Sequence, residues 1–141
     1  MIPNITLLME NITEITHPNR THKIVINEPD IDKSVRQDRI IGHVDDLEAI
    51  KQTIYLILST ERYKYIIYSW DFGVELADLI GKPMTYVMSE LPRRITEALT
   101  QDDRISDVVD FEFTRNGKKL HTTFTVITTA GNIPTELEVE V

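Results

Sequence analysis

The stretch TERYKYIIYSWDFGVEL, residues 60–76, is the densest apolar and aromatic run of the chain. Aromatic and β-branched residues favour strands, so the stretch predicts a central strand. Its apolar residues fall on both faces, as in Tyr65-Ile66-Ile67-Tyr68. Such a strand is usually covered on both sides, by the core and by a second layer or a partner. Asp71-Phe72-Gly73 predicts the turn that ends it.

A helical pattern precedes this stretch. Asp45 is a good N-cap, and Glu48 completes a capping-box pattern with it. Apolar residues then recur every three or four positions, which predicts one amphipathic helix that ends near Ser59-Thr60. Before this helix, Thr21–Ile26 and Arg39–Gly42 each predict a short strand.

A second helical pattern follows the stretch. Val74–Ile80 predicts one or two helical turns that end at Gly81, a typical residue just after a helix. Pro83 fits the first turn of a longer helix, whose 3.6-residue period continues to Leu99. Pro92 lies inside that period and removes a backbone donor, so we expect a kink or two abutting helices there.

From Val108 the apolar period changes to two, and Asn116-Gly117 is a strong hairpin signal. The hairpin is expected over residues 108–129, followed by a turn at Ala130-Gly131-Asn132 and a terminal strand over residues 135–141. A two-residue Asn116-Gly117 loop predicts one consistent apolar face. The expected pairs are Arg115 with Lys118, Phe113 with Leu120, Phe111 with Thr122, and Val109 with Phe124.

These elements predict an α+β fold: two main helices, the second kinked at Pro92, packed on a small, mostly antiparallel sheet with a C-terminal hairpin and a terminal strand. Residues 38–141 would form this domain. Residues 1–37 are weakly patterned, and we expect an N-terminal arm that is extended or becomes ordered on a partner.

Composition excludes several classes of protein. The net charge of −8 argues against nucleic-acid binding. No cysteine is present, which excludes a disulfide scaffold and a thiolate site and fits a reducing cytosol. No apolar run reaches the length of a membrane span, and the first residues lack the basic start of a signal peptide. Other proteins are therefore the expected partners.

The sequence contains no recognisable catalytic motif. The four histidines lack metal-ligand spacing, and the sequence holds neither a phosphate-binding glycine loop nor a nucleophile elbow. The densest acidic cluster surrounds Arg104. Its favoured interpretation is a solvated turn with a salt-bridged arginine, and a metal or catalytic site is the alternative. The cluster comprises Asp102, Asp103, Asp107 and Asp110. We therefore expect no enzyme activity, no metal and no cofactor.

Three patterns are candidates for contacts with other chains. Arg115, Lys118 and Lys119 crowd the hairpin tip of an otherwise acidic chain. The terminal strand alternates Leu137, Val139 and Val141 with glutamates. In the simpler interpretation, both patterns keep the protein soluble and protect the strand edge. In the functional interpretation, the basic tip docks on a partner and the terminal strand pairs with a strand of another chain. In the aromatic stretch, core packing is the simpler interpretation for most residues. Some of Tyr63, Tyr65 and Tyr68 are the alternative interface candidates, with Tyr63 and Tyr65 preferred.

The run GHVDDLEAIKQTIYLILSTERYKYIIYSWDFGVELADLIGK, followed by ELPRRITEAL and QDDRI, resembles the baseplate wedge proteins of contractile phage tails. It is most similar to their XkdS-like branch, found in prophages and phage-tail-like particles of Gram-positive bacteria. The resemblance covers roughly residues 38–141. Where the wider family often has Glu-Pro-Arg, this chain has Asp102-Asp103-Arg104. The resemblance implies that these residues form a structural buttress, in which Arg104 is the key polar residue.

The resemblance implies a non-enzymatic assembly protein of the inner baseplate wedge, next to the tail tube, from which sheath polymerisation begins. The implied partners are the tail sheath protein and other wedge proteins, with tube or hub proteins as further candidates. Six copies per baseplate are expected, made in the bacterial cytoplasm and built into the virion or tail-like particle. Its terminal strands are expected to pair with strands of the first sheath ring. The family's old lysozyme-like label finds no support in these residues.

Two other classes stay open. One is a regulatory protein-binding module that acts without a tail. The other is a glycan hydrolase using Asp102, Asp103 or Glu61, which would lose its activity on replacement of one carboxylate.

Overall fold

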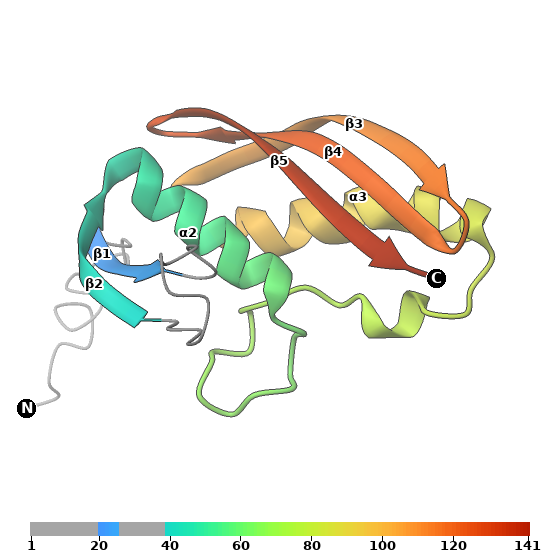
Figure 1. The fold of residues 1–141 in the computed structure, drawn as a ribbon, viewed down its shortest axis with the longest axis horizontal. Coiled ribbons are helices and arrows are strands. Elements are labelled where there is room, and N and C mark those ends of the chain that lie inside the picture. Colours follow the sequence, from blue (N-terminus) through green and yellow to red (C-terminus); the bar gives the residue numbers. More distant parts are fainter. Residues whose placement is uncertain (1–19, 26–38) are drawn as a thin grey trace, which may run out of the picture.

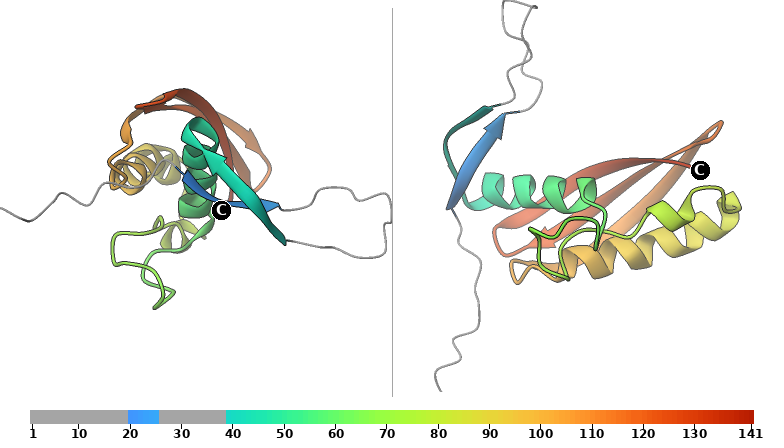
Figure 2. Two further views of the ribbon diagram at one scale, coloured as in Figure 1. Left: turned by 90° about the vertical axis from the view of Figure 1, so that its left-hand side faces the viewer. Right: turned by 90° about the horizontal axis from the view of Figure 1, so that it is seen from below.

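The computed structural model describes residues 20–25 and 39–141. In this part of the chain a three-stranded sheet covers two α-helices, and a two-stranded ribbon lies beside the start of the first helix (Figures 1 and 2). The α+β prediction is confirmed. The elements are β1 (Arg20–Val25), β2 (Arg39–Asp45), α2 (Asp46–Ser59), the 3-10 helix η1 (Ala77–Leu79), α3 (Met84–Thr100), β3 (Ile105–Asn116), β4 (Lys119–Thr128) and β5 (Gly131–Glu140).

The two short N-terminal strands pair with each other. β1 and β2 form an antiparallel ribbon, in which Arg20 lies opposite Asp45 and Val25 opposite Arg39. Gln52 of α2 ties the ribbon to the helix, because its side chain accepts from the Ile24 N–H at 2.9 Å and donates to the His22 carbonyl at 2.7 Å. Most of the expected arm over residues 1–37 lies outside the described residues, so its conformation stays a prediction.

The helices begin and end close to their predicted boundaries. Asp45 is the N-cap of α2, but its side chain makes no capping hydrogen bond, and Glu48 pairs with Lys51 instead at 2.8 Å. The expected capping box is therefore wrong. α3 starts directly after Pro83 and continues through Pro92 as one helix, so a bend at this proline stays a prediction. No helix in the described ranges has the length and apolarity to cross a membrane.

The three-stranded sheet has the order β3-β4-β5, with antiparallel pairing throughout. The hairpin lies where the sequence predicts it, but its two loop residues are Gly117 and Lys118, because Asn116 lies opposite Lys119. The pairing of Arg115 with Lys118 is therefore wrong. Arg115 faces Leu120 instead, and the register moves by two residues, which leaves the side-chain faces unchanged near the tip.

A bulge in β3 changes the rest of that register. The pairing shifts between Val109 and Glu112, and Asp110 adopts a left-handed φ of 59°. Because one extra residue reverses the faces beyond a bulge, Val108 is buried while Val109 is only half-buried. The expected partners of Phe113, Phe111 and Val109 are wrong: Phe113 lies opposite Thr122 and Val109 opposite Thr125, while Phe111 falls in the bulge.

The aromatic stretch is not a central strand, and this prediction is wrong. Residues 61–73 form a loop of successive turns that projects away from the sheet (Figures 1 and 2). Its only ladder contact among the described residues is an isolated bridge between Glu61 and Val74. After it, η1 supplies one short helical turn within Val74–Ile80, where the sequence predicts one or two turns.

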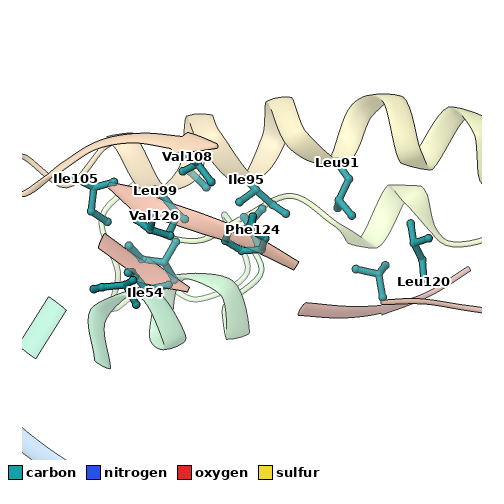
Figure 3. Close-up of a cluster of buried hydrophobic side chains, with 14 of the residues drawn as sticks. Ile54, Leu91, Ile95, Leu99, Ile105, Val108, Leu120, Phe124 and Val126 are labelled. Atoms are coloured by element: carbon teal, nitrogen blue, oxygen red, sulfur yellow. The ribbon is translucent and has the colours of Figure 1, made fainter. Parts of the chain in front are cut away.

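The core fills the space between the helices and the inner face of the sheet (Figure 3). Phe124 and Val126 of the central strand β4 meet Ile54 of α2 and Ile95 of α3 there. Burying one such side chain stabilises the fold by about 1.5–3 kcal/mol. Among the features that this packing leaves exposed are the loop after α2 and the outer edge of β5.

Candidate interaction surfaces

The predicted buttress forms a buried ion pair at the junction of α3 and β3. The Arg104 guanidinium donates to both carboxylate oxygens of Asp102, from Nε at 2.9 Å and from Nη2 at 2.7 Å. The side chains of Arg104 and Asp102 are 8% and 3% exposed. The Arg104 backbone N–H also donates to Asp102 Oδ1, at 3.0 Å. The pairing with Asp102 raises the pKa of Arg104. Asp103 is exposed beside them.

This ion pair connects three parts of the fold. Arg104 Nη2 also donates to the Thr53 hydroxyl of α2 at 3.1 Å, and that hydroxyl donates to the Ala49 carbonyl. The Arg104 carbonyl accepts from the N–H of Thr129, in the turn between β4 and β5, at 2.9 Å. One arginine thus holds the end of α3, the middle of α2 and the far end of the sheet together. This geometry fits the buttress that the sequence resemblance implies.

A second polar cluster fixes the base of the aromatic loop. The buried Arg62 donates to the Gly73 carbonyl from Nε at 3.2 Å and to Glu97 of α3 from Nη1 at 2.8 Å. Gly73 lies so close to the other side of the loop that an added Cβ would come within 2.6 Å of the Thr60 carbonyl oxygen. The Glu61 carboxylate accepts from the backbone N–H of Leu76 at 3.2 Å. The loop therefore leaves the body through a closed, hydrogen-bonded base.

The tip of this loop, residues 63–70, is largely exposed. Tyr63 and Tyr65, both predicted as interface candidates, are 63% and 48% exposed. Sequence reasoning missed Ile66, Ile67 and Trp70, which are more exposed still. Their signal was present, since an apolar run on both faces of a supposed strand requires a second covering layer or a partner.

The basic hairpin tip is exposed and partly neutralised. Lys119 pairs with Glu138 across the strands at 2.6 Å, and Arg115 Nε donates to the Gly117 carbonyl at 3.2 Å. Lys119 lowers the pKa of Glu138, and Glu138 raises the pKa of Lys119. Lys118 is exposed, and its carbonyl accepts from the Val141 N–H.

β5 is an edge strand. Val139 is buried, and Leu137 and Val141 are half-buried against the core, so a contact through this strand would use its backbone edge. The Val141 N–H donates to Lys118 at 2.8 Å, which directs the backbone groups of odd-numbered residues toward β4. Even-numbered residues from Glu136 onward therefore direct their N–H groups to the open edge, whereas Pro134 has none.

A groove of about 370 Å³ runs between α2 and β5. Ile54, Leu58 and Leu137 supply apolar side chains to it, and Glu136 and Glu138 supply acidic ones. An added strand at the β5 edge would place alternate side chains over this groove.

Two of the three carboxylates of the hydrolase alternative make hydrogen bonds within the fold. Asp102 pairs with Arg104, and Glu61 accepts backbone hydrogen bonds at the start of η1. Across the described residues no three histidine, cysteine or acidic side chains gather in a way that could hold a metal ion.

Comparison with known proteins decides the family. The family model for the contractile injection system sheath initiator matches residues 19–131. The chain belongs to this sheath-initiator family. It is also similar to the phage-like element PBSX protein XkdS of Bacillus subtilis (strain 168), with 39% identity over 127 residues that cover 88% of this chain and 84% of that protein.

Membership confirms the resemblance found in the sequence and gives the chain a structural role in a contractile tail, where a sheath initiator acts with the tail sheath. Its place is therefore in the tail particle. The match begins at residue 19, directly before β1, and extends through the aromatic loop, the buttress and the hairpin.

Proposed function

We propose that this chain is an inner wedge protein of the baseplate, next to the tail tube, and that it starts the sheath by accepting a strand of the first sheath ring on the open edge of β5. It works without catalysis, and its partners are the sheath subunit, other wedge proteins and the tube region. Six copies surround the tail axis. The protein joins the particle during assembly in the bacterial cytoplasm.

The open edge of β5 is the observation that carries this proposal. Its register with β4 runs without a shift from Lys119 opposite Glu140 to Thr128 opposite Gly131. An unpaired, regular edge is a template for another strand and a liability in an isolated protein. β3, the other edge strand, is interrupted by two register shifts, which twist an edge away from pairing.

The surroundings of β5 also favour an added strand after Pro134. The proline lacks an N–H, so uninterrupted donors begin at Glu136. The groove beside α2 offers an apolar floor for inward side chains of the incoming strand. Exposed Glu136, Glu138 and Glu140 lie on the outer face, where they favour a partner strand with basic side chains.

The test is Glu138→Pro, with Glu138→Ala as the matched control. Both variants lose the ion pair with Lys119. Only the proline variant also removes the N–H that points to the open edge. The N–H groups that β5 directs toward β4 are unchanged in both variants. Truncating the strand is a poorer test, since it would remove the buried Val139 from the core. We expect sheath subunits added to assembled baseplates to polymerise on the alanine variant and to fail on the proline variant.

The melting temperature of both variants is measured first, with Glu136→Pro as a second edge variant in case Glu138→Pro does not fold. Normal sheath growth on a folded proline variant would refute strand pairing at β5. Equal failure of the alanine variant would assign the effect to the glutamate side chain, and would also count against the backbone-edge mechanism.

A further inference from the structure

The aromatic loop carries an apolar surface that its own fold does not cover. Contiguous exposed apolar patches on soluble proteins usually mark interaction sites, whereas single exposed apolar residues do not. Six neighbouring side chains make up this patch. They are Tyr63 (63% exposed), Tyr65 (48%), Ile66 (102%), Ile67 (86%), Tyr68 (38%) and Trp70 (81%).

The patch has a defined shape, because its rings pack on one another. Tyr63 and Trp70 meet edge to face at 5.9 Å between ring centroids, and Tyr65 meets Tyr68 at 6.3 Å. Tyr68 in turn stacks on Phe72 at 4.5 Å, beside the base of the loop. Ile66 and Ile67, which lie between Tyr65 and Tyr68 in the sequence, are almost wholly exposed. Residues 63–70 therefore form a preformed protrusion, which we call the knob. Its fixed shape lowers the entropic cost of binding.

The base of the loop holds this knob firmly. Val74 donates to the Thr60 carbonyl at 3.0 Å, and Arg62 donates to the Val74 carbonyl at 3.2 Å. The Arg62 side chain adds its bonds to Gly73 and Glu97. Tyr63, the next residue, adopts a left-handed φ of 65°, which is unfavourable for an aromatic residue and is tolerated only where its surroundings enforce it.

The size of the patch matches one side of a stable interface. A buried aromatic side chain contributes about 150–250 Å², so the six partly exposed side chains offer on the order of 800 Å². That is about what one partner contributes to a protein–protein interface of standard size. Tyrosine and tryptophan are also the residues enriched among interface hot spots.

The charges of the loop and of the whole chain indicate which kind of partner the patch fits. Lys64 is the only Asp, Glu, Lys or Arg within residues 63–70, in a chain of net charge −8. A pocket with an apolar floor and an acidic rim would accept both the isoleucines and the lysine. The acidic chain as a whole would be repelled by anionic lipid, which favours a protein pocket over a membrane.

The position of the loop indicates that its partner is not the sheath subunit proposed to bind at β5. The loop projects on the side of the helices away from the sheet (Figures 1 and 2), so β5 and the loop can be occupied together. A second copy of the chain would offer its groove between α2 and β5, but a loop bound there would block the edge proposed for the sheath strand.

We propose that residues 63–70 are a docking knob that inserts Ile66, Ile67 and Trp70 into an apolar, acid-rimmed pocket on a baseplate wedge protein other than the sheath subunit. This inference rests on the proposed function for its setting. The protein thus has two separate contact sites: an aromatic knob that anchors it in the baseplate and a strand edge that receives the sheath.

The test measures binding of the full chain to each purified large wedge protein of the same tail gene cluster by isothermal titration calorimetry. Ile67→Asp and Trp70→Ala alter the knob. Ile80→Asp is the matched control, because Ile80 is also exposed, at 66%, but lies outside the knob after η1. We expect one wedge protein to bind, a loss of about 30-fold or more for both knob variants, and a change of less than about 3-fold for the control.

The inference would be overturned if no wedge protein bound the wild type, or if the knob variants bound as tightly as the wild type. Self-association by light scattering that the knob variants abolish would favour a second copy instead. Knob-dependent binding to vesicles of phosphatidylcholine and phosphatidylglycerol would favour a lipid surface. The sheath assay with Glu138→Pro is scored separately, so failure of strand pairing and failure of the knob are distinguishable.

Discussion

Removing the carboxylate of Asp102 should destabilise the protein far more than removing that of Glu138, although the two ion pairs have nearly equal lengths. Arg104 Nη2 lies 2.7 Å from Asp102 Oδ2, and Lys119 Nζ lies 2.6 Å from Glu138 Oε1. The buried pair is 8% and 3% exposed, and the surface pair is 53% and 51% exposed. Burial, and hence the local dielectric, distinguishes the pairs.

Asp102→Ala leaves a guanidinium buried without its carboxylate, which typically costs about 3–5 kcal/mol. Arg104 keeps its hydrogen bond to the Thr53 hydroxyl and the electrostatic attraction of the exposed Asp103, but it loses the two charge-assisted hydrogen bonds to the buried carboxylate. Since small domains have total stabilities of about 5–15 kcal/mol, the loss would be a third or more of the total for most of that range. Glu138→Ala removes only a solvated pair, so the free energy of unfolding should not change measurably.

Urea denaturation followed by far-UV circular dichroism measures both variants. Fluorescence is less suitable because the sole tryptophan, Trp70, lies on the exposed loop. The slope with urea should stay constant while the midpoint falls. The double variant with Asp102→Ala and Arg104→Met should recover part of the loss, because no charge then stays buried. A cost below about 1 kcal/mol for Asp102→Ala would refute the assignment of this pair as the buttress.

Three further predictions test the fold and its electrostatics. Phe124→Ala should cost about 3–5 kcal/mol, because the side chain is 2% exposed in the centre of the sheet. Phe113→Ala should cost clearly less by the same urea assay, because Phe113 is only half-buried; equal costs would contradict this difference in burial. Gly73→Ala should lower the melting temperature and open residues 63–72 to limited proteolysis, because the added Cβ would collide with the Thr60 carbonyl oxygen. Gly81→Ala is the control. Its Cβ meets no atom within 4 Å, so the loop should stay protected from the protease. The Arg94 guanidinium lowers the pKa of Asp78, so this carboxylate stabilises the fold above its unfolded pKa of about 3.9 and loses that effect as the pH falls through the lower folded value. Asp78→Asn should therefore melt earlier than the wild type at pH 7, and the two melting curves should converge in acid; a constant difference down to the lowest pH would contradict the pairing.

Local patterns predicted most of the secondary structure correctly. The 3.6-residue period after Asp45 and after Pro83 gave both helices within a residue or so of their ends, since one apolar stripe on a helix needs only one covering surface. Asn116-Gly117 placed the hairpin, although the loop itself is one residue further on. The buttress came from resemblance at Arg104, because the sequence alone does not reveal that Asp102 lies buried beside it.

The register of β3 could not be read from its alternation. Val108 and Val109 are equally apolar neighbours, and only packing against α3 selects Val108 for the core. The bulge at Asp110 accommodates that choice and still keeps Phe111 against Phe124, with ring centroids 5.3 Å apart. A one-residue slip costs nothing locally, so the choice is made by the helix beneath the sheet.

The sequence by itself determined the α+β class, the order of helices and strands, and an apolar stretch at residues 60–76 too rich in aromatics for one covered face. Only the tertiary structure decided where that stretch goes. Strand propensity is realised only when a neighbouring strand accepts the backbone bonds. The core-facing sides of the two helices are already covered by β3, β4 and β5, so the stretch has no place in the core as a further strand. With the core filled and its base closed by Arg62 and Gly73, the stretch leaves the body as an exposed loop.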